Sequence, residues 1–255
     1  MTTSYKTRVG AWISIASAFA AEQIAREGFD YVCVDGQHGL LDYGELRDAL
    51  IGITAAAGPT PFARVSTNSA AEIGRMLDAG AQGIIVPLVN SVEEAEEAAA
   101  AVRYPVSGGR RSYGPFRLGT HFAETPAQTD DGVTLLVMIE TASALEQVER
   151  IVAVEGIDGV YVGPYDLSLA LGAKVPFEPE ILPRLEEAIE RVRRAASAAG
   201  KLAGIHCVDG DMAQAKAAQG FDLVTAVTDI AALRSECSRQ LSLAKNQVQE
   251  RSSGY

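Results

Sequence analysis

The stretch GIDGVYVG at residues 156–163 decides the fold, because its pattern of a glycine, one or two residues and an apolar run occurs four times. The glycine of each copy follows an alanine-rich amphipathic segment and is typical of a helix end. The apolar run is typical of a parallel strand that is covered on both faces. The other copies are GFDYVCVD at 28–35, GAQGIIVP at 80–87 and GFDLVTAV at 220–227.

Further apolar runs lie between these copies. They occupy residues 9–15, 62–65, 133–139 and 202–207. Together with the four copies they give eight strands that alternate with helical segments. This pattern, at a length of 255 residues, predicts an α/β fold of the (β/α)8 TIM-barrel type. No low-complexity linker divides the chain, so we expect a single domain over residues 1–255.

Composition excludes several classes of protein. Asp and Glu outnumber Lys and Arg by 33 to 22, and the resulting charge of −11 argues against a nucleic-acid partner. No run of 18 apolar residues exists, so we expect no membrane span. The cysteines Cys33, Cys207 and Cys237 are far apart and form no CxxC pair, which suits a reducing, cytoplasmic location.

Two local signals concern the segments between strands. Ser91 and Glu94 form a predicted capping box that opens a helix running to about Val102. Residues 104–131 break the helical and strand periodicity and contain Arg110 and Arg111, and so long a loop is uncommon unless it is functional.

Chemistry in such a barrel concentrates where its strands end. Polar side chains follow the predicted strands at these points, and we expect them to meet at one end of the barrel. They are Asp35 and His38 after the second strand, Arg64 after the third, Glu140 after the fifth, Asp166 after the sixth and His206 after the seventh.

Glu140 and Asp166 follow neighbouring strands and could share a hard divalent cation such as Mg²⁺ or Mn²⁺. The alternative is that each carboxylate caps the helix that follows it. The residues alone leave these two interpretations about equal.

His38 and Arg64 also have two interpretations each. His38 is either a loop histidine or a general base that Asp35 orients. Arg64 either binds a substrate oxyanion or forms a salt bridge to a carboxylate of the same barrel end. We interpret His121 and His206 as structural.

The lysines argue against a Schiff-base aldolase, which needs a lysine in a desolvated pocket on a strand. Lys6 and Lys201 precede strands at the opposite end of the barrel, Lys216 and Lys245 fall in predicted helices, and Lys174 is in a loop. Metal-assisted enolate chemistry is therefore preferred.

Several segments resemble one known family. They are FDYVCVDGQH at 29–38, ARV at 63–65, GIIVPLV at 83–89, VMIET at 137–141 and VGPYDLS at 162–168. The chain resembles the metal-dependent class II pyruvate aldolases typified by 4-hydroxy-2-oxoheptanedioate aldolase, within the HpcH/HpaI aldolase/citrate lyase-like barrels. The resemblance runs over nearly the whole chain.

The resemblance implies a role for each matching residue. Glu140 and Asp166 would hold Mg²⁺ or Mn²⁺, with Co²⁺ as a further candidate, and pyruvate would bind the same cation. His38 would be the base, paired with Asp35, and Asp78 would raise the basicity of the histidine, reaching it across a subunit contact. Arg64 would stabilise the oxyanion.

The substrate site that the resemblance implies lies around Gly163, Pro164, Tyr165 and Asp166, where the N–H groups of Tyr165 and Asp166 would bind the pyruvate carboxylate. Met138 stands where these aldolases usually carry a substrate-contacting glutamine, which argues against the heptanedioate as substrate. The resemblance does not identify the aldehyde. Arg110 and Arg111 of the loop could bind an acidic or a polyhydroxylated aldehyde.

The implied reaction is the reversible cleavage of a 4-hydroxy-2-oxo acid to pyruvate and an aldehyde through an enolate. The implied assembly is a homohexamer, a trimer of dimers that exchange their last helices, with residues 230–243 docked on a neighbour. The competing functions are a citrate-lyase-β-like acyl-CoA lyase, an oxaloacetate decarboxylase and a non-catalytic oligomeric barrel.

Overall fold

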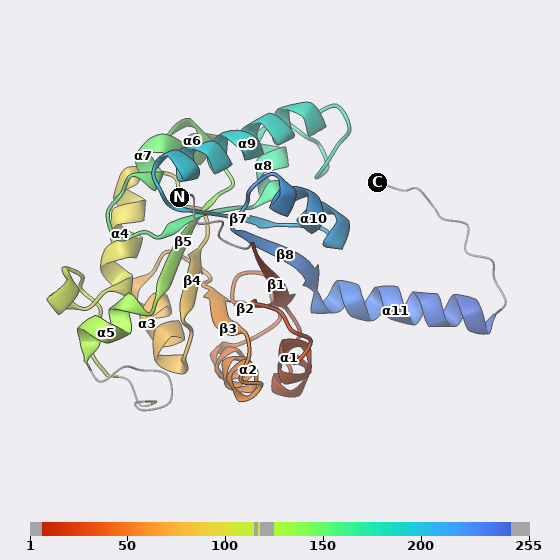
Figure 1. Cartoon of the computed structure of the whole chain (residues 1–255), viewed down its shortest axis with the longest axis horizontal. Helices are drawn as coiled ribbons and strands as arrows, with labels where there is room; N and C mark the ends of the chain where they lie inside the picture. Colours follow the sequence, from red (N-terminus) through yellow and green to blue (C-terminus); the bar gives the residue numbers. More distant parts are fainter. Residues whose placement is uncertain (1–6, 115–116, 118–124, 246–255) are drawn as a thin grey trace.

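The protein is a closed barrel of eight parallel strands in chain order, each paired with the next and β8 paired with β1 (Figure 1). The computed structural model describes residues 7–114, 117 and 125–245. The strands are β1 (Arg8–Ile13), β2 (Tyr31–Asp35), β3 (Thr60–Arg64), β4 (Gly83–Val86), β5 (Thr134–Ile139), β6 (Gly159–Val162), β7 (Leu202–His206) and β8 (Leu223–Thr228). The predicted barrel is confirmed.

Helices connect the strands and surround the barrel, as a parallel sheet requires. They are α1 (Ala18–Ala25), α2 (Tyr43–Ala55), α3 (Ala70–Ala79), α4 (Val92–Val102), the short 3₁₀ helix η1 (Pro105–Ser107), α5 (Pro126–Asp131), α6 (Ala142–Glu146), α7 (Val148–Val152), α8 (Pro164–Ala170), α9 (Leu182–Ala198), α10 (Gly210–Ala218) and α11 (Asp229–Ala244).

The repeated glycines lie in the turns between a helix and the next strand, in the left-handed region that glycine tolerates best. The φ angles of Gly28, Gly80, Gly156 and Gly220 are 91°, 112°, 89° and 96°. Each glycine lets the chain reverse from the outer helix into the next strand. The sequence pattern therefore identified the turns at which the barrel is built.

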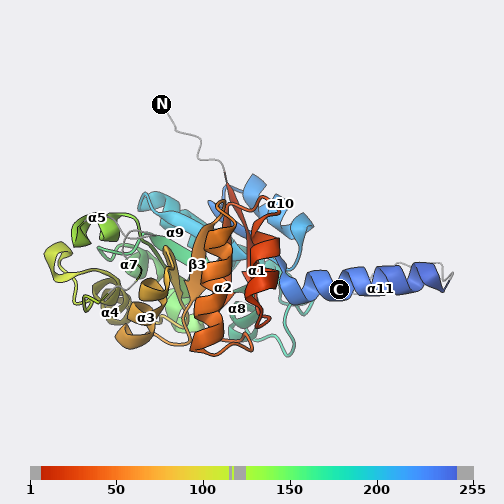
Figure 2. The ribbon, with the colours of Figure 1, turned by 90° about the horizontal axis from the view of Figure 1, so that it is seen from below.

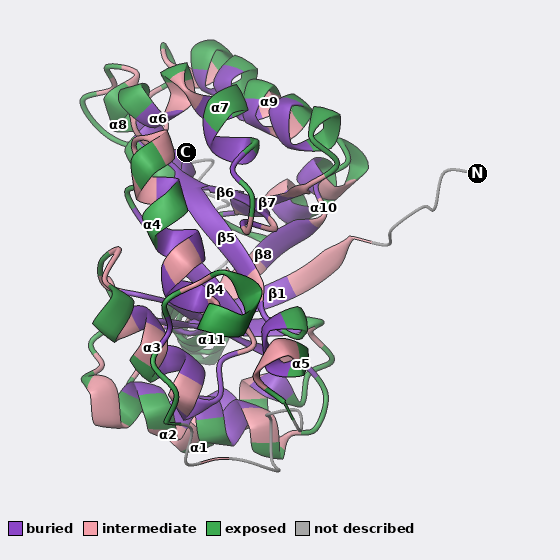
Figure 3. Cartoon of the chain, turned by 90° about the vertical axis from the view of Figure 1, so that its left-hand side faces the viewer, coloured by how far each residue is buried: buried purple, intermediate pink, exposed green. Residues whose placement is uncertain are grey.

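The core has two parts. One lies between the strands and the outer helices, and the other fills the barrel, where aromatic rings such as Phe62 and Tyr161 are buried. Burial follows the strands in Figure 3. A Cβ at Gly83 would lie 2.4 Å from the Phe62 ring, and one at Gly204 would lie 2.4 Å from the Tyr161 ring. Glycine on one strand thus makes room for an aromatic ring on its neighbour.

A buried hydrogen-bonded group lies inside the barrel. The hydroxyl of Thr225 is 3.1 Å from that of Tyr31 and 2.6 Å from that of Tyr161. Burial raises the pKa of both tyrosines, which keeps them protonated. Tyr161 precedes Gly163 by two residues and lies on the same face of the strand, so this group supports the site described below.

Some local predictions need correction. Ser91 caps α4 by accepting the N–H of Glu94, but the Glu94 carboxylate accepts the N–H of Asn90 rather than that of Ser91, so only half of the capping box forms. The predicted loop at 104–131 contains η1 and α5. His121 lies outside the described residues. Within the described chain no helix is both long and apolar enough to cross a membrane.

Helix α11 extends away from the barrel (Figures 1 and 2). It begins at Asp229, the one buried residue of this helix, whose carboxylate accepts the N–H groups of Ser14 and Ile15 at 2.9 and 2.8 Å. The rest of the helix exposes apolar side chains, including Leu233, Leu241 and Leu243. One end of α11 is therefore fixed to β1, and its length is uncovered in the single chain.

Candidate active site

A cavity of about 130 Å³ lies where the strands end. Most of the residues that the sequence predicted for the site line it. The lining consists of Trp12, His38, Arg64, Met138, Glu140, Gly163, Pro164, Tyr165, Asp166 and His206. No lysine is among these described residues, which agrees with the argument against a Schiff base.

Glu140 is the buried carboxylate of this pocket, with 2% of its surface exposed. Its Oε1 accepts the N–H of Leu88 at 2.7 Å, and Leu88 adopts a left-handed φ of 53° to present that group. A Cβ at position 163 would lie 2.5 Å from Glu140 Oε2, so Gly163 leaves the space that this oxygen needs. Burial raises the pKa of Glu140; the Leu88 N–H opposes this and the charge of Asp166 adds to it.

Neither carboxylate caps a helix. Thr141 caps α6 by accepting the N–H of Ala144 at 3.1 Å, and the N-cap of α8 is Gly163, so that helix has no side-chain cap. Asp166 forms no hydrogen bond or salt bridge with any described residue. The capping alternative is therefore wrong, and both carboxylates are available to a ligand.

The donor set fits a hard divalent cation. Two carboxylates face one pocket, and the neighbouring charge of Asp166 disfavours ionisation of Glu140, which a bound cation would reverse. The described residues include no group of three or more acidic, histidine or cysteine side chains placed so that they could hold a metal ion together. Such a cation would keep coordination positions for water or substrate oxygens, as Mg²⁺ commonly does.

Arg64 is held by Asp35. The Asp35 carboxylate accepts hydrogen bonds from Arg64 Nε at 2.9 Å and from NH2 at 2.7 Å. Burial alone would raise the pKa of Asp35, but the hydrogen bonds and charge of Arg64 outweigh it and lower the pKa. The guanidinium also lies 5.2 Å from the centre of the Trp12 ring. The pair fixes a cation at the pocket in one orientation.

Arg64 thus forms the salt bridge that one of its two interpretations predicted, and its guanidinium also lines the pocket. Asp35 also accepts the backbone N–H groups of Gln37 and His38, at 3.0 and 3.3 Å. It therefore fixes the loop that carries His38 into the pocket, and its hydrogen bond to His38 goes to the backbone. That His38 acts as a base remains a prediction.

Asp78 and the loop arginines lie elsewhere in the chain. Asp78, near the end of α3, forms a salt bridge with Arg111 at 2.8 Å, and Arg111 stacks on Tyr104 at 4.5 Å. Arg110 donates its backbone N–H to Ala100. None of these side chains lines the pocket.

Sequence reasoning missed Trp12 as a pocket residue, and it placed His206 at this end of the barrel without giving it a role in the pocket. Trp12 lies within an apolar strand, and His206 was interpreted as structural. His206 is the last residue of β7, as expected from its position in the sequence, and strand ends converge there.

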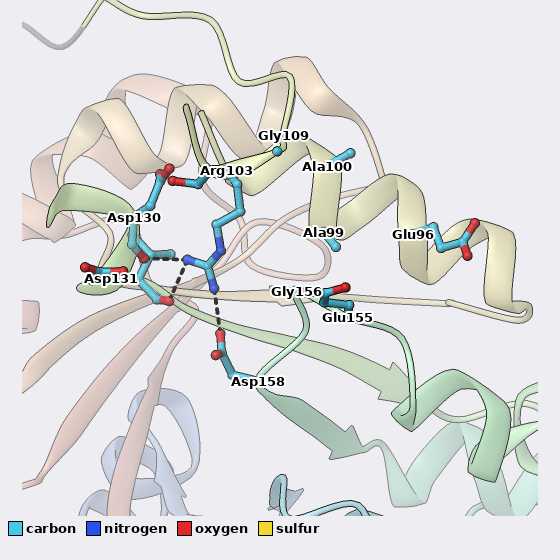
Figure 4. A pocket seen from close by; sticks show the side chains of 13 residues that line it. Glu96, Ala99, Ala100, Arg103, Gly109, Asp130, Asp131, Glu155, Gly156 and Asp158 are labelled. Carbon is cyan, nitrogen blue, oxygen red and sulfur yellow. Dashed lines mark hydrogen bonds and ion pairs between the residues drawn. The ribbon is translucent and has the colours of Figure 1, made fainter. Parts of the chain in front are cut away.

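A larger cavity, of about 620 Å³, lies at the opposite end of the barrel (Figure 4). Acidic side chains there surround the cation of Arg103. The guanidinium of Arg103 donates hydrogen bonds to the Asp158 carboxylate and to the backbone carbonyls of Asp130 and Val133. The cavity precedes β5 and β6, and its described lining includes no histidine, lysine or cysteine. The smaller pocket is the candidate active site because two carboxylates, two histidines and an arginine line it.

A (β/α)8 barrel with two carboxylates in a pocket at its strand ends defines the class as a TIM-barrel enzyme. The chain belongs to the HpcH/HpaI aldolase/citrate lyase family, whose model matches residues 8–235. It is therefore a carbon–carbon lyase.

Named relatives agree with this class. The chain is 42% identical to a hydroxypyruvate/pyruvate aldolase of Rhizorhabdus wittichii, over 90% of each chain. It is 35% identical to a 4-hydroxy-2-oxo-heptane-1,7-dioate aldolase of Klebsiella pneumoniae, over 77% of this chain and 76% of the relative. A crystal structure of a family member from Burkholderia cenocepacia aligns with a TM-score of 0.85 and 28% identity, covering 95% of this chain and 96% of the other.

Proposed function

We propose that the protein reversibly cleaves a 4-hydroxy-2-oxo acid into pyruvate and an aldehyde, with a divalent cation, Mg²⁺ or Mn²⁺, held by Glu140 and Asp166. The observation that carries this proposal is that the two carboxylates line one pocket and neither caps a helix. When bound, the cation would supply positive charge that stabilises an enolate oxygen. The named relatives support pyruvate as a product.

His38 removes the proton of the C4 hydroxyl. The C3–C4 bond then breaks, its electron pair moves toward the C2 oxygen, and the aldehyde leaves. Arg64, which Asp35 holds in place, lies where it can stabilise the negative oxygen. Protonation of C3 completes pyruvate.

The N–H groups of Tyr165 and Asp166 would bind the pyruvate carboxylate. They lie in the first turn of α8, where Gly163 offers no side-chain cap and Pro164 has no N–H. Met138 supplies an apolar wall to this part of the pocket. Asp78 would act only from a neighbouring subunit.

Oligomerisation belongs to the same proposal. We expect a homo-oligomer, a hexamer built as a trimer of dimers, in which α11 docks on a neighbour, because Leu233, Leu241 and Leu243 are more than half exposed in the single chain. Light scattering coupled to size-exclusion chromatography measures the assembly, and a monomer would contradict it.

The experiment that tests the proposed chemistry follows deuterium exchange into the methyl group of pyruvate by NMR. The protein is first treated with a chelator and then resupplied with Mg²⁺ or Mn²⁺. We expect exchange that depends on the metal and is lost in Glu140→Gln and Asp166→Asn.

Other outcomes favour other functions. If the protein exchanges deuterium into pyruvate and releases CO₂ from oxaloacetate, but forms no product from pyruvate and an aldehyde, the decarboxylase is favoured. No exchange with the metal bound would favour the acyl-CoA lyase, and no metal binding would favour a non-catalytic barrel.

A further inference from the structure

His206 is a pocket side chain to which the proposed reaction gives no role. The register pairs Ile139 with Val162 and Val162 with Ile205, so the next residues, Glu140, Gly163 and His206, lie side by side on three adjacent strands. His206 therefore lines the pocket on the far side of Gly163 from Glu140.

Aromatic contacts fix the orientation of the His206 ring. It lies edge-on to Trp12, with 4.9 Å between ring centres and 84° between the planes, and 6.4 Å from the ring centre of Tyr165. No described residue forms a hydrogen bond with either ring nitrogen. Both ring nitrogens are therefore available to a ligand group in the pocket.

The imidazole is neutral at pH 7. Burial and the charge of Arg64 lower the pKa of His206 to about 4, although Asp35 opposes this. A neutral imidazole has one N–H donor and one acceptor nitrogen, which together match a hydroxyl group.

The surrounding charges disfavour an acidic aldehyde. Among the described residues lining the pocket, Arg64 is the one permanent cation, and Asp35 already neutralises it. Arg110 and Arg111 do not line the pocket, whereas Glu140 and Asp166 do. With Glu140 and Asp166 committed to the proposed cation and Arg64 to Asp35, no side-chain cation among the described lining residues is left to pair with a second substrate carboxylate.

We propose that His206 is a specificity-determining residue that hydrogen-bonds the hydroxyl of an uncharged α-hydroxyaldehyde. This inference rests on the proposed function.

The test compares glycolaldehyde with acetaldehyde, two-carbon aldehydes that differ by one hydroxyl, as partners of pyruvate in the metal-loaded enzyme. His206→Phe keeps a ring beside Trp12 and removes the hydrogen bond, while His206→Asn keeps a donor and an acceptor. We expect His206→Phe to lower the ratio of kcat/KM for glycolaldehyde to that for acetaldehyde about tenfold. His206→Asn should keep part of the preference, and it carries the test if the Phe variant does not fold.

Intrinsic aldehyde reactivity cancels, because the ratio is compared between wild type and variant. An unchanged ratio, or a wild type that prefers succinic semialdehyde, a carboxylated aldehyde, would overturn the inference.

Deuterium exchange into pyruvate separates the two proposals. If the wild type exchanges deuterium but His206→Phe leaves the aldehyde ratio unchanged, only the role of His206 is refuted. If the wild type shows no exchange, the proposed function is refuted, and this inference with it.

Discussion

Replacing Asp35 by Asn should cost this protein much more stability than breaking an equally well-formed pair at its surface. Asp35 binds Arg64 through both carboxylate oxygens, and the two residues are 3% and 9% exposed. The Asp35→Asn variant keeps an oxygen for the backbone N–H of Gln37 but leaves the Arg64 charge uncompensated. Removing one partner of a buried pair costs about 3–5 kcal/mol of unfolding free energy.

The matched control is Glu149→Gln. Glu149 binds Arg191 in the same two-contact geometry, at 3.0 and 2.9 Å, but their side chains are 56% and 44% exposed. An exposed pair contributes about 0–1 kcal/mol. Urea unfolding at one fixed protein concentration measures both losses, since subunit association would shift stability with concentration.

The dependence of the Asp35 effect on pH follows from the lowered pKa of its carboxyl. A lowered pKa stabilises the fold above the unfolded value, 3.8, and this stabilisation disappears as the pH falls through the folded value. The difference between wild type and Asp35→Asn should therefore be constant from about pH 5 to 8 and shrink only in stronger acid. Adding Arg64→Met should restore part of the lost stability. Equal losses in Asp35→Asn and Glu149→Gln, or no recovery in the double variant, would refute the reasoning.

Three further predictions concern the pocket. Glu140→Gln should stabilise the metal-free protein at pH 7 by on the order of 1 kcal/mol, because burial raises the pKa of Glu140 and disfavours its charged form. The same variant should abolish the rise in Tm that Mn²⁺ causes, and a retained rise would exclude Glu140 as a ligand. Gly163→Ala should weaken Mn²⁺ binding about tenfold by titration calorimetry, because the new Cβ meets Glu140 Oε2; the control Gly74→Ala, whose Cβ meets nothing within 4 Å, should leave binding unchanged. His38→Ala should lower turnover by about 10²–10⁴ with little change in metal affinity, and normal turnover would refute its role as the base.

Much of the fold was predictable because its signals are local. Gly28, Gly80, Gly156 and Gly220 all adopt the left-handed conformation that a helix end favours, and the apolar run after each becomes a buried strand. Strand ends were also predictable, and with them the placement of Glu140 and Asp166 in one pocket.

Partners of side chains were less predictable, because they depend on which strands and loops become neighbours. Asp35 and Arg64 are 29 residues apart and meet because β2 and β3 pair them in register. The sequence suggested His38 as the partner of Asp35 from a spacing of three residues, and the structure gives His38 only a backbone contact. Arg111, expected near the substrate, binds Asp78 outside the pocket.

The sequence by itself determined the barrel, because glycine, helix and strand signals are each contained within a few neighbouring residues. Only the tertiary structure decided that neither Glu140 nor Asp166 caps a helix, that Asp35 holds Arg64, and that His206 faces the pocket without a hydrogen-bond partner among the described residues. These outcomes depend on strand register, on burial and on charges brought together from distant segments, which local sequence patterns do not encode.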